Sequence, residues 1–398
     1  MIGEGAAEVG AGMGVPTVPA MPRRQVVWGA LAFIALTLGV FWWIFRHVPE
    51  GHVAPTLADF HWRYLPLLLL VLPVETVTSS ARIWLICRVL HPGVSYRTCV
   101  RSELANVALS TLTPSQSGGG PGQIYVLRRD GGVSVGTGLT ATLLSFMGTM
   151  AGLLVMGIYA LLSGVGVHGR LFLAPAWTMT AIAAILLLGA TWPDAIRVTL
   201  AAFSRTVWRA LRRPDAVRDW WPPAATRAGA AVDRMDPTTA WFVDLLYTYR
   251  DDVWRFLRHG KASGVAVCLL SVAFLLARAL IPYLCARFLG VEGGTLRQIL
   301  EAQVALIFLV FFAPTPGGAG VAEGASLWIM REIVPPGVAP YYNLLWRASA
   351  VYLAALAGLL CLGVSLARDA RGRVLGIGRP RRGPALDLNR GRRKETRP

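Results

Sequence analysis

The sequence predicts an all-α polytopic membrane protein, with six full transmembrane helices plus two re-entrant hairpins in an inverted repeat. Apolar residues make up 54% of the 398 residues and charged residues only 15%, which is too apolar for a soluble domain. Several apolar runs reach the length of about 20 residues that crosses a membrane. Two proline- and glycine-rich breaks also interrupt apolar regions, which is typical of internally repeated transporters.

The two breaks resemble one another when the chain is shifted by 200 residues. This superposition places Pro114 on Pro314, Gly118 on Gly318, Gly120 on Gly320 and Gln123 on Glu323. Glycine and proline are common in this chain, so part of the match could arise by chance. The polar residue that closes both breaks argues against chance.

The apolar runs predict the elements in chain order. The six full spans are predicted at residues 25–45, 64–87, 138–162, 171–192, 263–289 and 341–366. Shorter apolar stretches flank the breaks, at residues 104–112 before the first, and at 299–313 and 321–330 around the second. Each break is therefore predicted to form the tip of a helical hairpin.

The remaining segments are polar. We expect residues 1–22 to be a disordered leader, 23–367 to be the transmembrane domain, and 193–262 to be a basic cytoplasmic loop with helices at the membrane interface. Residues 368–398 are predicted to form a basic disordered tail. The loop and tail either bind anionic lipid headgroups or serve as solvated anchors of the topology.

The basic residues predict the orientation of the chain and explain its net charge of +17 without a nucleic-acid partner. If each break enters and leaves on one side, most arginines share a side with Arg23. The opposite side then carries only Arg46, Arg63, Arg170, Arg297 and Arg331. This predicts a multi-pass protein of the cell (inner or plasma) membrane with both termini in the cytoplasm. The two hairpins then approach the midplane from opposite faces.

A charge at the centre of a span costs about 2.5–3.5 kcal/mol on insertion scales, so the depth of the charged residues within the predicted spans decides which of them need an explanation. Arg82 is six residues from Arg88, or about 9 Å along a helix, so its side chain could extend to the cytoplasmic interface. Glu75 and Arg278 lie deeper and are expected to face a polar interior. Arg347 lies about one and a half turns into the last span, so its depth leaves both environments open.

Two interpretations of these charges remain open. They either pair with each other to hold the helices together, or line a cavity in which arginine binds an anionic headgroup in a bidentate manner. The second interpretation makes the hairpin tips the gate or site, where helix N-termini add N–H donors. The candidate substrate-binding residues are Arg82, Arg278, Arg347, Glu75, Pro114, Gly118, Gly120, Gln123, Pro314, Gly317, Gly318, Gly320 and Glu323.

Enzymatic and metal-binding motifs are not recognised. The five cysteines show no C-x-x-C spacing and the six histidines no metal-binding spacing. We therefore expect no catalytic residue, metal or cofactor. With no ATP-binding motif, a gradient would drive any transport, or the protein equilibrates lipids.

These residues resemble the flippase-like family typified by the transmembrane region of lysylphosphatidylglycerol synthases. The resemblance covers most of residues 25–367 and rests on the P-x-x-G-G-x-G-x-x-E pattern from Pro314 to Glu323. The first break followed by Leu127-Arg-Arg supports it, as do Arg82 and Trp84. The family usually has Gly-Glu where this chain has Gly122-Gln123, usually has the arginine and tryptophan adjacent, and has a shorter loop than 193–262.

The resemblance implies movement of a polar or charged lipid between leaflets, the lipid being a phospholipid, a glycolipid or a polyprenyl-linked lipid. An alternative is an integral-membrane lipid or glycan transferase, whose general base would be one of four carboxylates. These are Glu75, Glu103, Glu301 and Glu323. A third interpretation is a scaffold that binds envelope-synthesis enzymes through the basic loop and tail.

Overall fold

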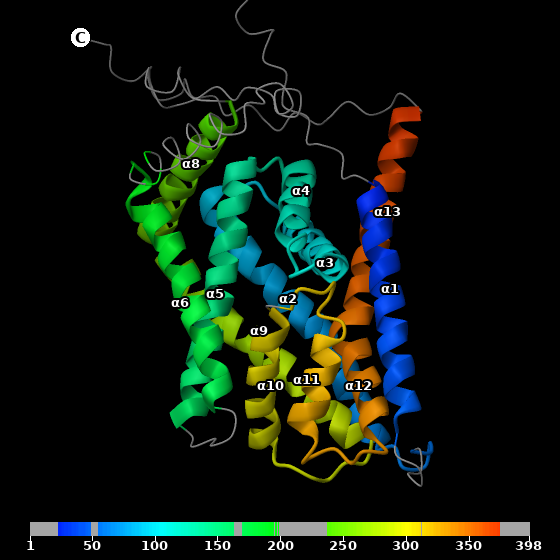
Figure 1. Ribbon diagram of the computed structural model, residues 1–398. Helices are drawn as coiled ribbons and strands as arrows, with labels where there is room; N and C mark the ends of the chain where they lie inside the picture. Colours follow the sequence, from blue (N-terminus) through cyan, green and yellow to red (C-terminus); the bar gives the residue numbers. More distant parts are fainter. Residues whose placement is uncertain are drawn as a thin grey trace, which may run out of the picture.

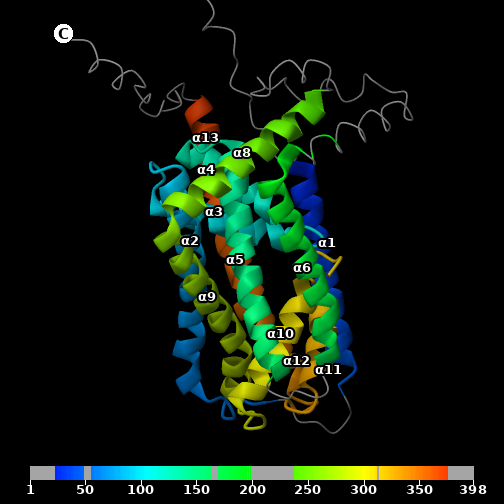
Figure 2. The same cartoon turned by 90° about the vertical axis from the view of Figure 1, so that its left-hand side faces the viewer.

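The computed structural model describes residues 23–48, 55–162, 169–194, 196, 198, 237–311 and 313–374, and its regular elements there are all helical. The helices are α1 (Arg23–Arg46), α2 (Leu65–Leu90), α3 (Tyr96–Leu112), α4 (Gly119–Gly131), α5 (Val135–Leu162), α6 (Gly169–Thr191), α8 (Pro237–His259), α9 (Lys261–Phe288), α10 (Leu296–Phe311), α11 (Val321–Met330), α12 (Ala339–Arg347) and α13 (Leu353–Val374). A 3₁₀ turn, η1 (Trp62–Tyr64), precedes α2, and a π-helical turn, η3 (Ala348–Tyr352), joins α12 to α13. Most of the long helices run along one common direction (Figures 1 and 2).

Five described helices are long and apolar enough to cross a membrane. They are Val27–Arg46, Trp62–Leu90, Val135–Ile158, Lys261–Phe288 and Ala339–Val364, and they coincide with five of the six predicted spans. The predicted span 171–192 coincides with α6, of which only the shorter stretch Thr180–Thr191 has described side chains. The chain is therefore an all-helical, multi-pass membrane protein, and the count of six spans stays a prediction.

Large apolar side chains cover the outward faces of the long helices. On α1, Trp28, Leu38 and Trp42 are each exposed by more than three-fifths, and on α2, Leu69 and Leu70 also point outward. Leaving such a side chain in water forgoes about 1.5–3 kcal/mol of transfer free energy. This surface is therefore suited to contact with lipid tails.

Helices α2 and α9 form a closely packed antiparallel pair that runs along one side of the bundle in Figure 2. The contacts between them run in opposite order, because Glu75 near the middle of α2 meets Arg278, whereas Arg82 further along α2 meets Ser271 earlier in α9. The larger apolar core lies on the α9 side of this pair and includes Leu275. The pair gives the bundle a fixed frame on which polar side chains can be positioned.

Two short helical hairpins enter the bundle from opposite ends (Figure 1). The first consists of α3 and α4, and the second consists of α10 and α11. Their tips meet inside the bundle, where Pro114 and Pro316 form an isolated antiparallel β-bridge. The two breaks seen in the sequence are therefore in direct contact.

The two tips differ in backbone conformation although their sequences superpose. In the second tip three glycines adopt positive φ: 58° at Gly317, 70° at Gly318 and 85° at Gly320. In the first tip the positive φ values fall on Ser115 at 50° and Gln116 at 56°. Gly118, which the superposition places on Gly318, is the N-cap of α4 and has a φ of −78°. The repeat seen in the sequence does not extend to the local backbone of the tips.

Helix α8 lies within the predicted loop 193–262 and packs across α5 and α6 (Figure 2). Tyr249 and Val253 are buried in this contact, whereas Leu257 and Arg258 are exposed. The Tyr249 hydroxyl donates to the Leu186 carbonyl oxygen at 3.2 Å. The predicted leader and residues 375–398 of the tail lie outside the described residues, as does most of the loop before α8.

We predict that Gly317→Ala lowers the free energy of unfolding by about 1–3 kcal/mol, because alanine at positive φ is strained. The added methyl group would also lie 3.1 Å from the Thr111 carbonyl oxygen and 2.7 Å from a ring carbon of Phe33. Chemical unfolding of the purified protein in micelles measures the change. Gly363→Ala is the matched control, because nothing lies within 4 Å of its added carbon. Equal effects of the two substitutions would contradict the tight fit of the tips.

Candidate functional site

A cavity of about 650 Å³ lies where the two hairpin tips meet α2, α5 and α9. We call it the central cavity. Five charged side chains line it: Glu75, Arg82, Glu103, Arg278 and Arg347. Its walls also contain hydroxyl and amide groups from α2, α3, α4, α5 and α10, so the interior offers many polar contacts although the bundle is apolar outside.

The predicted site residues fall into two groups. Those that line the central cavity are Glu75, Arg82, Gly120, Gln123, Arg278, Gly317 and Arg347. Those that lie at the tips outside its lining are Pro114, Gly118, Pro314, Gly318, Gly320 and Glu323. The fold thus brings the intramembrane charges of α2, α9 and α12 into one space.

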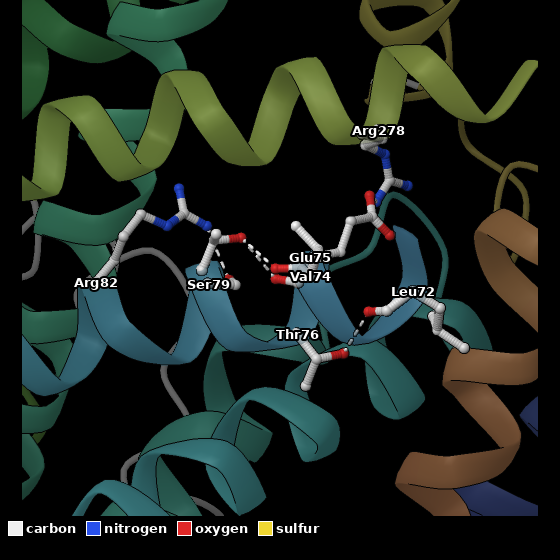
Figure 3. Close-up of polar contacts among 8 residues, drawn as sticks. Leu72, Val74, Glu75, Thr76, Ser79, Arg82 and Arg278 are labelled. Carbon is white, nitrogen blue, oxygen red and sulfur yellow. Dashed lines mark hydrogen bonds and ion pairs between the residues drawn. The ribbon is translucent and has the colours of Figure 1, made fainter. Parts of the chain in front are cut away.

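Glu75 and Arg278 face each other across the α2–α9 pair (Figure 3). Arg278 Nη1 lies 3.5 Å from Glu75 Oε1, a distance at the outer limit of a hydrogen bond. The Glu75 side chain is only 7% exposed, but that of Arg278 is 33% exposed. Arg278 therefore pairs loosely with Glu75, and part of its side chain remains exposed although it lines the cavity.

Arg82 remains inside the bundle and does not extend outward, although its depth allowed either position. The residue is only 3% exposed and lies on the same face of α2 as Glu75 and Ser79 (Figure 3). Its Nη1 donates to the hydroxyls of Thr149 at 2.6 Å and Ser271 at 3.2 Å, and its Nη2 donates to Ser79 at 2.8 Å. These hydroxyls take the place of water around the two terminal nitrogens of the guanidinium and hold the side chain inside the bundle.

Arg347 connects the last long helical segment to the second hairpin tip. Its Nε lies 2.7 Å from Glu323 Oε1 and its Nη2 donates to the Gly317 carbonyl oxygen at 2.9 Å. The other carboxylate oxygen of Glu323 accepts from the Gly320 N–H at 2.6 Å. Both charged side chains are almost completely buried, so this ion pair fixes the tip within the bundle.

Two residues missing from the predicted site, Glu103 and Gln303, also line the cavity. Gln123 Nε2 donates to Glu103 Oε2 at 2.9 Å, which joins the two arms of the first hairpin. Gln303 is 2% exposed, and its Nε2 has no hydrogen-bond partner among the described residues. The shift of 200 residues that pairs Gln123 with Glu323 also pairs Glu103 with Gln303, and this signal could have found both.

The lining provides charges and hydrogen-bond donors rather than a metal centre. Within the described residues, no group of three or more His, Cys, Asp or Glu side chains is placed to hold a metal ion. The Glu301 carboxylate accepts from Arg297 Nε at 2.8 Å and does not line the cavity. The arrangement is suited to holding a charged or polar group away from lipid.

Comparison with known proteins found one family. Residues 27–358 match the family described as "Lysylphosphatidylglycerol synthase TM region". The match spans both hairpins and every charged residue of the central cavity. No curated protein and no solved structure matches the chain.

We predict that Arg347→Met and Glu323→Gln each lower the free energy of unfolding by about 3–5 kcal/mol, since each leaves a buried partner charge uncompensated. The double substitution should cost clearly less than the two single effects combined. Chemical unfolding in micelles measures all three variants. Arg331→Gln is the control, because Arg331 and Glu332 form an exposed pair at 3.8 Å, and such pairs contribute about 0–1 kcal/mol. Additive single effects would contradict a direct coupling.

Proposed function

Because the chain belongs to the family of lysylphosphatidylglycerol synthase transmembrane regions, we propose that it moves a lipid with a phosphate-bearing polar headgroup between the two leaflets of a membrane. The resemblance predicted from the sequence is confirmed by the family match. That membership is consistent with a membrane protein that has a role connected to lipids. Translocation is the specific activity that we propose.

One observation carries the proposal: a charged cavity lies inside a bundle whose outer surface is apolar. Moving a headgroup through hydrocarbon is costly because its charges lose their water. A polar cavity at mid-depth supplies replacement contacts while the acyl chains stay in lipid. A volume of about 650 Å³ also falls within the range of about 300–1,000 Å³ typical of ligand sites.

We further propose that the two hairpins are re-entrant and form the corresponding parts of an inverted repeat. Their entry from opposite ends (Figure 1) and the contact between Pro114 and Pro316 support this arrangement. In the proposed cycle each tip closes the cavity toward one side of the membrane. Opening of one tip at a time would give alternating access.

The orientation proposed from the sequence is also retained. One end of the bundle holds the C-terminus of α2, the first hairpin and α8 (Figure 1). The basic residues near this end include Arg88, Arg97, Arg101, Arg128, Arg129, Arg255, Arg258 and Lys261. We assign this end to the cytoplasm of a cell membrane, following the preference of Lys and Arg for that side.

Arg278 is the proposed primary contact for the phosphate. It is the most exposed arginine of the central cavity, and its contact with Glu75 is long, so a phosphate oxygen can add to its donors. Arg82 and Arg347 are held by protein partners, and they contribute positive potential to the same space. Guanidinium groups suit this role because they bind phosphate in a bidentate manner.

We predict that Arg278→Ala slows lipid translocation at least about tenfold, because losing a hydrogen bond to a charged group costs about 1.5–3 kcal/mol. The assay uses purified protein in liposomes that contain lipids labelled on an acyl chain. A membrane-impermeant quencher reports how fast the protected label becomes accessible. Unchanged kinetics in the variant would contradict the assignment of Arg278.

The matched control is Arg258→Ala on the exposed face of α8. It removes the same charge outside the cavity, so translocation should keep its normal rate. If the normal protein moves none of the phosphate-bearing lipids tested, the proposed function fails.

A transferase of lipid or glycan groups is the second candidate function, and the position of two carboxylates favours keeping it. Glu75 and Glu103 line the cavity, where a general base would have to lie. Glu323 is fully buried beneath Arg347, and Glu301 lies outside the lining. Incubating the purified protein with a labelled lipid-linked donor and an acceptor tests this candidate, since a transferase yields a new labelled product and a translocator does not.

A further inference from the structure

The charges of the central cavity balance, but they are not all paired with one another. Its three arginines are matched in number by Glu75 and Glu103 of the lining together with Glu323, which is buried outside the lining beside Arg347. Two direct pairs account for four of these charges: Arg347 with Glu323 at 2.7 Å, and Arg278 with Glu75 at 3.5 Å. Arg82 and Glu103 remain, and they form no direct ion pair in the described part of the chain.

Neutral groups alone hold the two remaining charges. Arg82 donates to three hydroxyls and lies over the ring of Phe274 at 4.6 Å. Glu103 accepts from the amide of Gln123. Each of the two charges lacks a counter-ion in contact, and a site of low dielectric makes that costly. The cavity thus presents one positive and one negative position to a ligand.

A buried hydrogen-bond donor in the lining points to a ligand independently of these two charges. Gln303 Nε2 is buried in the lining without a partner among the described residues, and a buried donor in that state calls for an acceptor. Oxygen atoms of a phosphodiester or of an ester carbonyl would provide one. The donor comes from the second hairpin, whereas Glu103 comes from the first.

We propose that the central cavity selects a zwitterionic headgroup, with the phosphodiester directed to Arg82 and Arg278 and the ammonium group directed to Glu103. This inference rests on the proposed function, since it names the class of lipid that the same cavity takes. A zwitterion leaves the summed charge of the cavity at zero and gives each remaining charge a counter-ion. An anionic headgroup would instead leave Glu103 facing added negative charge.

The test compares three lipids with identical labelled acyl chains in liposomes. They are phosphatidylethanolamine, which is zwitterionic, phosphatidylglycerol, which is anionic, and an ethyl-phosphatidylcholine, which is cationic. The normal protein should translocate phosphatidylethanolamine at least about tenfold faster than phosphatidylglycerol, a ratio equivalent to about 1.4 kcal/mol. Equal rates, or a preference for phosphatidylglycerol, would overturn the proposal.

Two substitutions that each remove one charge then move the preference in opposite directions. Glu103→Gln keeps the shape and an acceptor for Gln123 but makes the summed charge positive, so it should reverse the preference toward phosphatidylglycerol. Arg82→Gln makes the sum negative and should favour the cationic lipid. Arg82 has three protein partners, so its variant is interpreted only if it elutes as a folded species; Glu103→Gln decides the test in either case.

Glu332→Gln is the control for charge at a distance, because its side chain is 81% exposed. It should leave the order of the three lipids unchanged. If Glu103→Gln also leaves that order unchanged, the assignment of the ammonium group to Glu103 is wrong.

Equilibrium binding of the three lipids to the detergent-purified protein separates this inference from the proposed function. Selective binding of phosphatidylethanolamine without translocation would refute transport and support the zwitterionic site. Translocation with no selectivity in rate or binding would support transport and refute the zwitterionic site.

Discussion

Irregular backbone inside an apolar bundle must find its hydrogen-bond partners within the protein, and this requirement organises the centre of the molecule. In the second hairpin, Glu323 accepts from the Gly320 N–H and Arg347 donates to the Gly317 carbonyl oxygen. In the first hairpin, the Thr113 hydroxyl accepts from the Gly118 N–H at 2.8 Å. The side chains that satisfy the backbone groups of the second tip therefore place the Arg347–Glu323 ion pair beside the cavity. Arg347 thus holds the tip and, in the proposed function, also adds positive potential to the cavity.

Features with a local signal could be predicted from the sequence. The length of apolar runs predicted the long helices, and proline with glycine predicted both hairpin tips, because each signal acts within a few residues. Depth along a helix placed Glu75 and Arg278 in the interior, where they form a contact. Their contact with a substrate is part of the proposed function. Helix α6 agrees with the fourth span in position, although much of its apolar surface lies outside the described residues.

Features that depend on distant partners could not be predicted in the same way. Depth alone allowed Arg82 to extend to the interface. Its partners inside the bundle are Thr149 in α5 and Ser271 in α9, which are 67 and 189 residues further along the chain. Gln303 carries no signal of its own, and only the repeat relation with Glu103 draws attention to it. The shift of 200 residues also overstated the likeness of the tips, since positive φ falls on different positions in each.

The difference between the tips has an energetic consequence. In the first tip, Ser115 and Gln116 hold left-handed backbone that costs a residue with a side chain about 1–2 kcal/mol, whereas glycine adopts it in the second tip without that cost. Among the described residues of the two tips, this conformational energy is therefore stored at the first tip. A rearrangement that returned Ser115 and Gln116 to right-handed backbone would release it. In the proposed cycle the two hairpins would therefore differ in the energy needed to open, so one closed side would be the preferred resting state.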